Sequence, residues 1–264
     1  MRSLPISLLA AALLIGGCAS LPDQWVRFPG LSDCPETSPT SLLANGDRFG
    51  PGSSTHSLQC ALSVARNSNA PEVQRSALPS RLALHLAERE PDSARKEALA
   101  REGVQWAEQA LRQGAERDGA VHYYLAANLG LAVHQHPLQA ADSVSRLEQE
   151  LQTAVRLSPG VDDGGPLRLL GMLYLKAPSW PTGIGDGDKA LGWLQKAVDQ
   201  YPQHPLNHLF HAEALWEVDE KGDAARSALE EGLRQLRSGP WGYNKTIWGK
   251  EFSQVAQELD TPLR

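Results

Sequence analysis

A 3.6-residue apolar period runs through most of the chain and most constrains what it can fold into. The period starts at Thr55, where Leu58, Leu62 and Ala65 form one stripe. Short linkers containing Pro, Gly or Asp separate the later periodic segments, and strand-like alternation is not apparent. The chain is therefore expected to be all-α. The predicted helices are 55–66, 72–89 with a break near Pro79, 94–112, 118–135, 138–157, 166–177, 187–201, 205–219, 223–237 and 246–259.

Two consecutive segments repeat one spacing of small and large residues. The first-helix positions are Ala126, Leu129, Gly130 and Val133 in one unit, and Leu167, Leu170, Gly171 and Tyr174 in the next. The second-helix positions are Leu147, Leu151, Ala154 and Pro159, then Ala190, Leu194, Ala197 and Pro202, with steps of four, three and five residues in both units. A third unit follows with Leu209, Ala212, Trp216, Ala225, Leu229 and Gly232. Small residues at such positions let two helices cross closely.

This spacing resembles the tetratricopeptide repeat. Leu167 replaces the Trp of the motif, and the loops inside the two complete units are longer than the motif has. The resemblance implies helical hairpins that stack in a right-handed superhelix with a concave face. The final predicted helix, 246–259, would cap the last apolar face. The alternative is a generic helical bundle whose alanines fall in register by chance.

Composition and charge narrow the function classes. The chain has 264 residues, of which 41% are hydrophobic and 21% charged, as in ordinary globular proteins. These values exclude wholesale disorder and a polytopic membrane protein. The formal net charge is −6, whereas a nucleic-acid-binding protein typically carries an excess of Lys and Arg. We therefore expect no nucleic-acid partner.

The N-terminal segment has the pattern of a targeting signal. Arg2 precedes an apolar run from Leu4 to Ile15, which is too short to span a bilayer as a stable helix. The run ends in Gly16-Gly17-Cys18, which resembles the lipobox of bacterial lipoproteins. The resemblance implies cleavage before Cys18, acylation of its thiol and amine, and, because Ala19 follows, an outer-membrane anchor facing the periplasm. The alternative is a plain secretory signal with an incidental Cys.

The two other cysteines are Cys34 and Cys60. An oxidising compartment would let them pair, and the disulfide would stabilise the fold by roughly 3 kcal/mol. It would fix the Pro-, Ser- and Gly-rich arm, residues 29 to 57, to the first helix. The alternative is two unpaired thiols, with Cys60 a small core residue.

Residues 95 to 236 also resemble a particular lipoprotein family, the T component associated with tripartite TRAP-type transporters. The similar stretches are 122–130 (HYYLAANLG), 169–174 (LLGMLY), 177–181 (APSWP), 185–190 (GDGDKA) and 205–208 (PLNH). The resemblance implies a periplasmic, lipid-anchored helical protein that forms a homo-oligomer. It also implies a pocket for a hydrophobic or anionic small molecule, and a substrate-binding protein as the periplasmic partner.

Sequence motifs give little support for catalysis. The chain contains no His-Glu-x-x-His motif, nucleophile elbow or phosphate-binding loop. Asp186 and Asp188 lack the acidic twelfth residue of an EF-hand, and one of them is expected to cap the helix that contains Ala190. His208 and His211 could share a helix face, but a third ligand is not evident, so structural or surface histidines are favoured. We predict no enzyme, no cofactor and no metal site.

Repeat geometry selects candidate binding residues. In this repeat class four positions of each first helix commonly face the groove. They select Tyr124, Leu131 and His134 in one unit, Arg168, Met172 and Leu175 in the next, and Asn207, Phe210 and Glu217 in the last. Trp180 stands in the inserted loop and is expected either to cover a pocket as a lid or to pack onto the repeat as a plug. The alternative is that several of these residues only pack against neighbouring helices.

These observations give one organisation and two competing functions. The predicted regions are a signal peptide (1–17), a lipid-anchored tether and coil (18–54) and a helical repeat domain (55–264). The favoured function is binding of a small molecule or peptide in the concave groove, as an accessory to envelope transport. The alternative is a protein–protein interaction scaffold for an envelope assembly complex.

Overall fold

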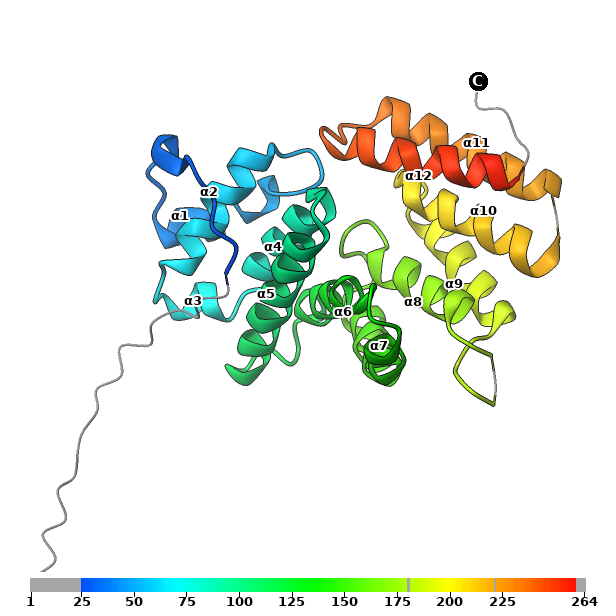
Figure 1. Ribbon diagram of the computed structural model, residues 1–264, viewed down its shortest axis with the longest axis horizontal. Helices are drawn as coiled ribbons and strands as arrows, with labels where there is room; N and C mark the ends of the chain where they lie inside the picture. The colour runs from blue at the N-terminus through cyan, green and yellow to red at the C-terminus, as the bar shows by residue number, and fades with distance from the viewer. Residues whose placement is uncertain (1–24, 180, 221, 260–264) are drawn as a thin grey trace, which may run out of the picture.

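The computed structural model describes residues 25–179, 181–220 and 222–259, and this part of the chain is helical without a β-strand. After a short arm come the long helices of the body (Figure 1). The arm contains η1 (Leu31–Asp33), α1 (Pro39–Ala44) and η2 (Gly46–Arg48). The body contains α2 (Thr55–Arg66), α3 (Pro71–Gln74), α4 (Leu78–Arg89), α5 (Ser93–Arg112), α6 (Gly119–Val133), α7 (Pro137–Leu157), α8 (Gly165–Lys176), α9 (Gly187–Gln200), α10 (Pro205–Asp219), α11 (Gly222–Ser238) and α12 (Asn244–Glu258).

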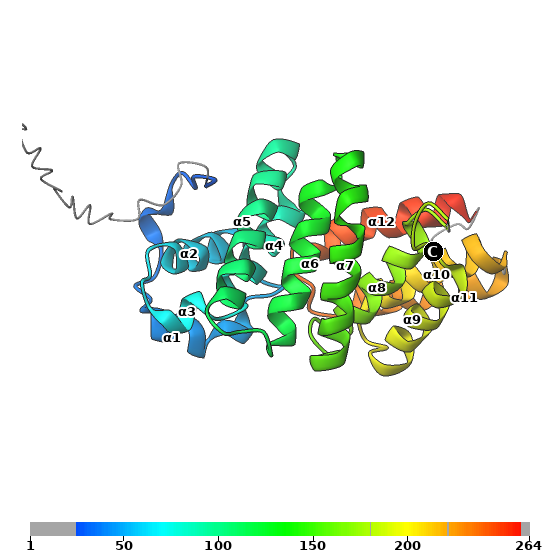
Figure 2. The same cartoon turned by 90° about the horizontal axis from the view of Figure 1, so that it is seen from below.

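From α4 onward each helix packs on the helix that follows it in sequence. Figure 2 shows α5, α6 and α7 side by side in this row. Such an arrangement buries each amphipathic face against its sequence neighbours, as helical repeats do. The all-helical prediction is confirmed.

Local sequence signals set most helix ends. The side chains of Ser54, Asp92, Asp118 and Asp186 accept backbone N–H groups at the starts of α2, α5, α6 and α9. This satisfies donors that the first turn leaves free. Asp186 thus caps the helix of Ala190, as predicted. Pro79 lies in the first turn of α4, where a missing N–H costs nothing, so the break predicted near it is a helix start.

Small residues allow close helix crossings. A Cβ added at Gly171 of α8 would lie 2.5 Å from Leu194 Cγ of α9. A Cβ added at Gly232 of α11 would lie 2.7 Å from the ring of Phe252 on α12. Both glycines therefore lie where a neighbouring helix packs directly against the backbone.

The segment before α2 differs from the predicted coil. It contains the short helix α1, and Leu42 of that helix is fully buried in the core formed by α2, α4 and α5. The disulfide between Cys34 and Cys60 joins this arm to α2, with the Cα atoms 5.5 Å apart. Arg66 of α2 also donates to the carbonyl of Val26 at 2.9 Å. A single buried leucine is too little apolar signal to predict α1 from periodicity.

The two ends of the row meet. The guanidinium of Arg89, at the end of α4, donates to Asn244 Oδ1 at the start of α12 and to the carbonyls of Pro51 and Ser53. Gly52 packs so closely on the carbonyl of Pro240 that a side chain at position 52 has no room. We call these contacts together the clasp. They join Arg89 and residues 50–53 to residues 240–244. The row of helices therefore curves back so that the start of α12 meets the end of α4 (Figure 1).

Candidate functional site

A cavity of about 570 Å³ lies on the inner face of the curved row. This volume is typical of small-molecule sites, and so is a mainly apolar wall with few polar groups. Helices α4, α6, α8 and α10 supply much of the wall, and α12 faces them. The apolar lining residues are Pro51, Leu84, Ala126, Ala127, Leu131, Leu147, Leu151, Leu169, Met172, Leu173, Leu206, Phe210, Ile247 and Trp248.

One end of the cavity holds a buried polar group that we call the base cluster: Tyr123, Asp162 and Arg168. Asp162 Oδ2 accepts a hydrogen bond from the Tyr123 hydroxyl at 2.7 Å. The same oxygen forms an ion pair with Arg168 Nη2 at 2.6 Å. Burial is the largest single influence and raises the pKa of Asp162, but Arg168, His204, His85 and the hydrogen bond from Tyr123 together lower it below its ordinary value. An ionised, ion-paired carboxylate is a weak base, so this cluster fits anchoring rather than acid–base catalysis.

The backbone around Asp162 explains why this carboxylate reaches the cavity. Asp162, Asp163 and Gly164 are three consecutive residues with left-handed φ values of 52°, 46° and 89°. Aspartate tolerates this region better than most residues, although it still costs free energy. Arg168 stabilises the turn because it also donates to Asn207 Oδ1 at 2.7 Å, and Asn207 Nδ2 donates to the Asp163 carbonyl.

The opposite end of the cavity carries mixed charges. We call Glu88, Lys96, His134, Lys176 and Glu251 the rim cluster. On α6, Tyr123 of the base and His134 of the rim are eleven residues apart, which corresponds to about 16 Å of helix. Tyr123 and Arg168 of the base are buried and Asp162 is half-buried, whereas His134 and Glu251 are exposed, so the rim is the solvent side.

Two rim residues differ in how their charge is compensated. Lys176 forms ion pairs with Glu213, at 3.2 Å, and with Glu217. Burial by itself lowers the pKa of Lys176, but Glu217 and Glu213 together raise it above its ordinary value. Lys96 is half-buried and has no ion pair with any residue that the structure describes.

Glu251 lies in a setting that disfavours its charge. Its side chain reaches solvent, but it stands on the concave face, where protein surrounds it on several sides. Burial, together with the negative charges of Glu88 and Glu213, raises its pKa to about 7, and Lys96 opposes this shift. Glu251 is therefore partly protonated at neutral pH.

Five of the nine predicted groove residues line the cavity. They are Leu131, His134, Arg168, Met172 and Phe210. Repeat geometry found them because the inner positions of α6, α8 and α10 recur at helical spacing.

The other four predicted groove residues lie outside the cavity wall. Tyr124 is buried in the core between helices, and its neighbour Tyr123 faces the cavity instead. Asn207 is fully buried beside Arg168, where it holds the base cluster. Leu175 packs against the core of α6 to α9, and Glu217 pairs with Lys176. An error of one residue on a helix rotates a side chain by about 100°, which explains the exchange of Tyr123 for Tyr124.

Sequence reasoning missed Glu88, Lys96, Asp162, Lys176 and Glu251. Three of them lie on α4, α5 and α12, outside the two complete repeat units, and Asp162 lies in a loop. The signal that could have found Asp162 is the Asp-Asp-Gly sequence, which favours left-handed backbone.

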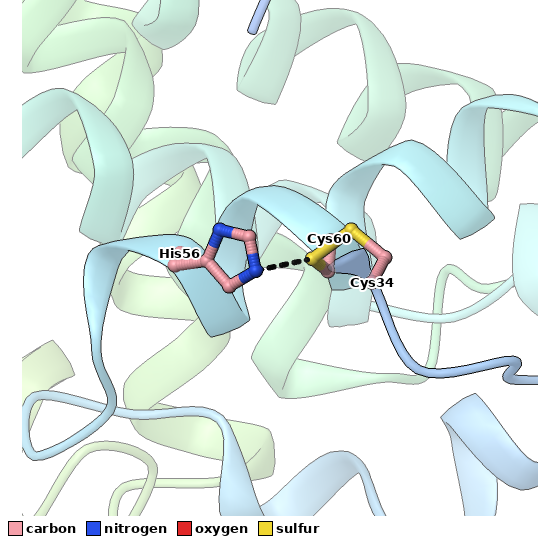
Figure 3. A group of neighbouring side chains, drawn as sticks. All are labelled: Cys34, His56 and Cys60. Atoms are coloured by element: carbon pink, nitrogen blue, oxygen red, sulfur yellow. Dashed lines mark hydrogen bonds between the residues drawn. A yellow bond between two sulfur atoms is a disulfide. The ribbon is translucent and has the colours of Figure 1, made fainter. Parts of the chain in front are cut away.

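Among the described residues, one group combines three side chains of metal-ligand type within 4.8 Å: Cys34, His56 and Cys60. Figure 3 shows the His56 ring beside the Cys60 sulfur, with Nε2 at 3.5 Å. The two sulfurs are bonded to each other, so they are not thiolate ligands. This group fixes the arm to α2.

The histidines at the start of α10 are buried rather than on the surface. His204 is 1% exposed and lies between the rings of Trp241 and Trp248, at 5.1 and 5.2 Å. Burial lowers its pKa to about 3, so it is neutral. His208 Nε2 lies 2.7 Å from the carbonyl of Pro202. Trp241, Trp248 and His204 thus pack α12 onto α10.

Two predicted sites fall outside the described residues: the lipidation site Cys18, with its signal peptide, and the lid residue Trp180. Within the described part of the chain, none of the helices has the length and apolar character needed to cross a bilayer. Comparison with known proteins adds no relationship: no family model matches the chain, and no curated protein sequence matches it.

Proposed function

We propose that this chain is a lipid-anchored binding protein of the outer membrane that faces the periplasm and takes a small amphiphilic molecule into its central cavity. The observation that carries the proposal is the 570 Å³ cavity, whose walls are apolar and whose two ends are polar. A scaffold would need only an open, shallow groove. The clasp instead joins the end of α4 to the start of α12, so that residues from both ends of the row line one half-open pocket.

The proposed architecture is a tetratricopeptide-like array in a right-handed superhelix. Helix order and the close crossings at Gly171 and Gly232 support repeats. The proposed anchor is acylated Cys18, supported by the lipobox-like Gly16-Gly17-Cys18. Mass spectrometry of the mature N-terminus tests the anchor. A tri-acylated Cys18 is expected, and an unmodified Cys18 or cleavage elsewhere would reject it.

The proposed role is that of an accessory to envelope transport, working beside a substrate-binding protein and as a homo-oligomer, as in the T components that the sequence resembles. Cross-linking in intact envelopes followed by mass spectrometry tests this role. Capture of a substrate-binding protein supports it. Capture of envelope assembly proteins, together with an empty cavity, would favour the scaffold.

Blocking the cavity tests the binding function directly. A Cβ at Gly130 of α6 meets only Leu147 Cδ2, at 3.9 Å, so a larger side chain there projects into the cavity. Gly192 of α9 is a helical glycine with nothing within 4 Å of an added Cβ, and it lies outside the cavity. Gly130→Phe and Gly192→Phe are therefore a matched pair.

The probe is N-phenyl-1-naphthylamine, an uncharged fluorescent molecule whose emission rises in apolar surroundings. The wild type and Gly192→Phe should bind it, and Gly130→Phe should bind at least tenfold more weakly with its helical circular dichroism unchanged. Equal binding by both variants would remove the cavity as the site. Arg168→Ala is a poorer test because Arg168 is 3% exposed and holds Asp162 and Asn207 in place.

A further inference from the structure

The two carboxylate oxygens of Asp162 differ in their hydrogen bonding. The Tyr123 hydroxyl and Arg168 Nη2 both donate to Oδ2, at 2.7 and 2.6 Å. Among the residues that the structure describes, none donates a hydrogen bond to Oδ1. The Asp162 side chain is 17% exposed and lines the cavity, so Oδ1 is the oxygen left for a bound molecule. A charged acceptor without a donor in largely apolar surroundings costs free energy, so Oδ1 favours a ligand that donates.

The polar side chains beside Asp162 are committed to other groups. Arg168 Nη1 donates to Asn207 Oδ1 at 2.7 Å, and both Nη atoms also contact the carbonyl oxygen of Asp162. His85 of α4 lines the cavity as well, but its Nδ1 lies 3.3 Å from Glu88 Oε2. A neutral His85 ring that donates from Nδ1 to this carboxylate has only an acceptor at Nε2. These residues therefore do not supply the donor that Oδ1 lacks.

The loop that carries Asp162 holds this carboxylate in a fixed position. Asp162, Asp163 and Gly164 have left-handed φ values of 52°, 46° and 89°. An added Cβ at Gly165 would lie 2.5 Å from the Tyr123 hydroxyl oxygen, so the tyrosine packs directly on the backbone that follows the loop. Strained backbone of this kind persists where the surrounding contacts fix it, and it is frequent at ligand sites. The base of the cavity therefore presents a preformed acceptor.

The charge balance at the base favours an uncharged donor. Arg168 already compensates the charge of Asp162 at a distance of 2.6 Å. An anionic head group would meet Oδ1 without a proton to share. A cationic head group would lose its hydration at a place where the charges are already balanced. A hydroxyl group donates one hydrogen bond and carries no charge, so it matches Oδ1.

We infer that the ligand is an uncharged amphiphile whose buried end carries a hydroxyl group, and that this hydroxyl donates to Asp162 Oδ1 at the base. This ligand class rests on the proposed binding function. The apolar part of the molecule lies along the apolar wall, which extends about 16 Å from base to rim along α6. The base is the favourable end for the hydroxyl, because a hydrogen bond is stronger there than at the rim, where water competes for it.

Two probes of equal size test the inference: 1-octanol, which donates a hydrogen bond, and 1-methoxyheptane, an ether that only accepts one. The affinity of each is measured by its displacement of bound N-phenyl-1-naphthylamine. The wild type should bind 1-octanol about tenfold more tightly than the ether, as expected for one hydrogen bond to a charged acceptor. Octylammonium should bind no more tightly than 1-octanol. Equal affinities of alcohol and ether, tighter binding of octylammonium, or failure of 1-octanol to displace the dye would overturn the inference.

The same measurements separate this inference from the proposed function. Dye binding that Gly130→Phe weakens and Gly192→Phe preserves leaves the proposed function standing, whatever the preference between alcohol and ether. Absence of dye binding by the wild type would instead overturn the proposed function, and the inference with it.

Asp162→Asn tests the role of Oδ1. Tyr123 and Arg168 donate at the Oδ2 position, so the amide oxygen should stay there and the amide nitrogen should replace Oδ1. The alcohol and the ether can both accept from this nitrogen, so the preference for 1-octanol should disappear.

Asp163→Asn is the matched control. It makes the same change in charge at the adjacent left-handed residue, whose side chain is exposed outside the cavity, and it should keep the preference. Loss of the preference in both variants, or in neither, would overturn the inference. Circular dichroism checks the fold of both variants, and the wild-type comparison of alcohol with ether decides by itself if Asp162→Asn does not fold.

Discussion

Arg89 Nε donates a hydrogen bond of 3.0 Å to Oδ1 of Asn244, a residue 155 positions later in the chain. Arrays of helical hairpins normally contact only their sequence neighbours. This contact therefore changes the shape of the surface: it joins the end of α4 to the start of α12, so that α12 lines a half-open pocket together with helices from earlier in the row.

The Arg89–Asn244 contact should contribute measurably to stability. Arg89→Ala should lower the free energy of unfolding by about 3 kcal/mol, because Asn244 Oδ1 and the Ser53 carbonyl lose the buried guanidinium that donates to them. Urea denaturation measures this change. Arg95→Ala, whose pair with Glu90 is exposed, should cost less than about 0.5 kcal/mol. A double-mutant cycle of Arg89→Ala with Asn244→Ala should give a coupling of about 1 kcal/mol. Additive effects would show that the clasp does not depend on this pair.

Two glutamates on α5 should differ strongly in their contribution to stability. Glu102 is 1% exposed and receives Arg66 Nε and Nη2 at 2.8 and 2.6 Å. Glu108 pairs with Arg146 at the surface. Glu102→Ala should cost about 3 kcal/mol because it leaves a buried cation unpaired, and Glu108→Ala should change stability by less than about 0.5 kcal/mol. Thermal unfolding of the two variants compares them, and equal costs would mean that Arg66 finds solvent or another partner.

Replacing each of two helical glycines with alanine should change the free energy of unfolding in opposite directions. Alanine at Gly171 meets Leu194 Cγ at 2.5 Å, so overpacking should outweigh the gain in helix propensity and destabilise by about 1 kcal/mol. Alanine at Gly192 has nothing within 4 Å and should stabilise by roughly 0.5–1 kcal/mol. Denaturant midpoints test both changes. Stabilisation by Gly171→Ala would show that α8 and α9 do not cross as closely as described.

Glu251 should make stability depend on pH with a defined sign. Its pKa of about 7 in the folded protein is higher than in the unfolded chain, so the folded state holds more protons between these two values. Its contribution is therefore greatest at low pH and is lost as the pH rises through about 7. Glu251→Gln should gain stability relative to the wild type between pH 5 and pH 8, whereas exposed Glu230→Gln should show no such trend. A difference that stays constant with pH would contradict the raised pKa.

Much of the fold could be predicted because helix formation leaves local marks. Apolar stripes such as Leu58, Leu62 and Ala65, and caps such as Asp186, lie within a few residues of the structure they specify. The predicted helices from α4 to α12 consequently agree closely with those observed. Helix α1 was not predictable in this way, because its single buried leucine is held by distant residues rather than by its own pattern.

In the candidate site, too, local sequence signals predicted some residues, and contacts between distant residues placed the others. The sequence by itself determined that the inner positions of α6, α8 and α10 recur, and this was enough for Met172 and Phe210. Only the tertiary structure decided that Tyr123 rather than Tyr124 faces inward, and that Glu88, Lys96 and Glu251 meet at one end. The reason is physical: periodicity records which face of a helix is apolar, whereas a cavity and its charges depend on contacts such as Arg89 with Asn244, which no local spacing encodes.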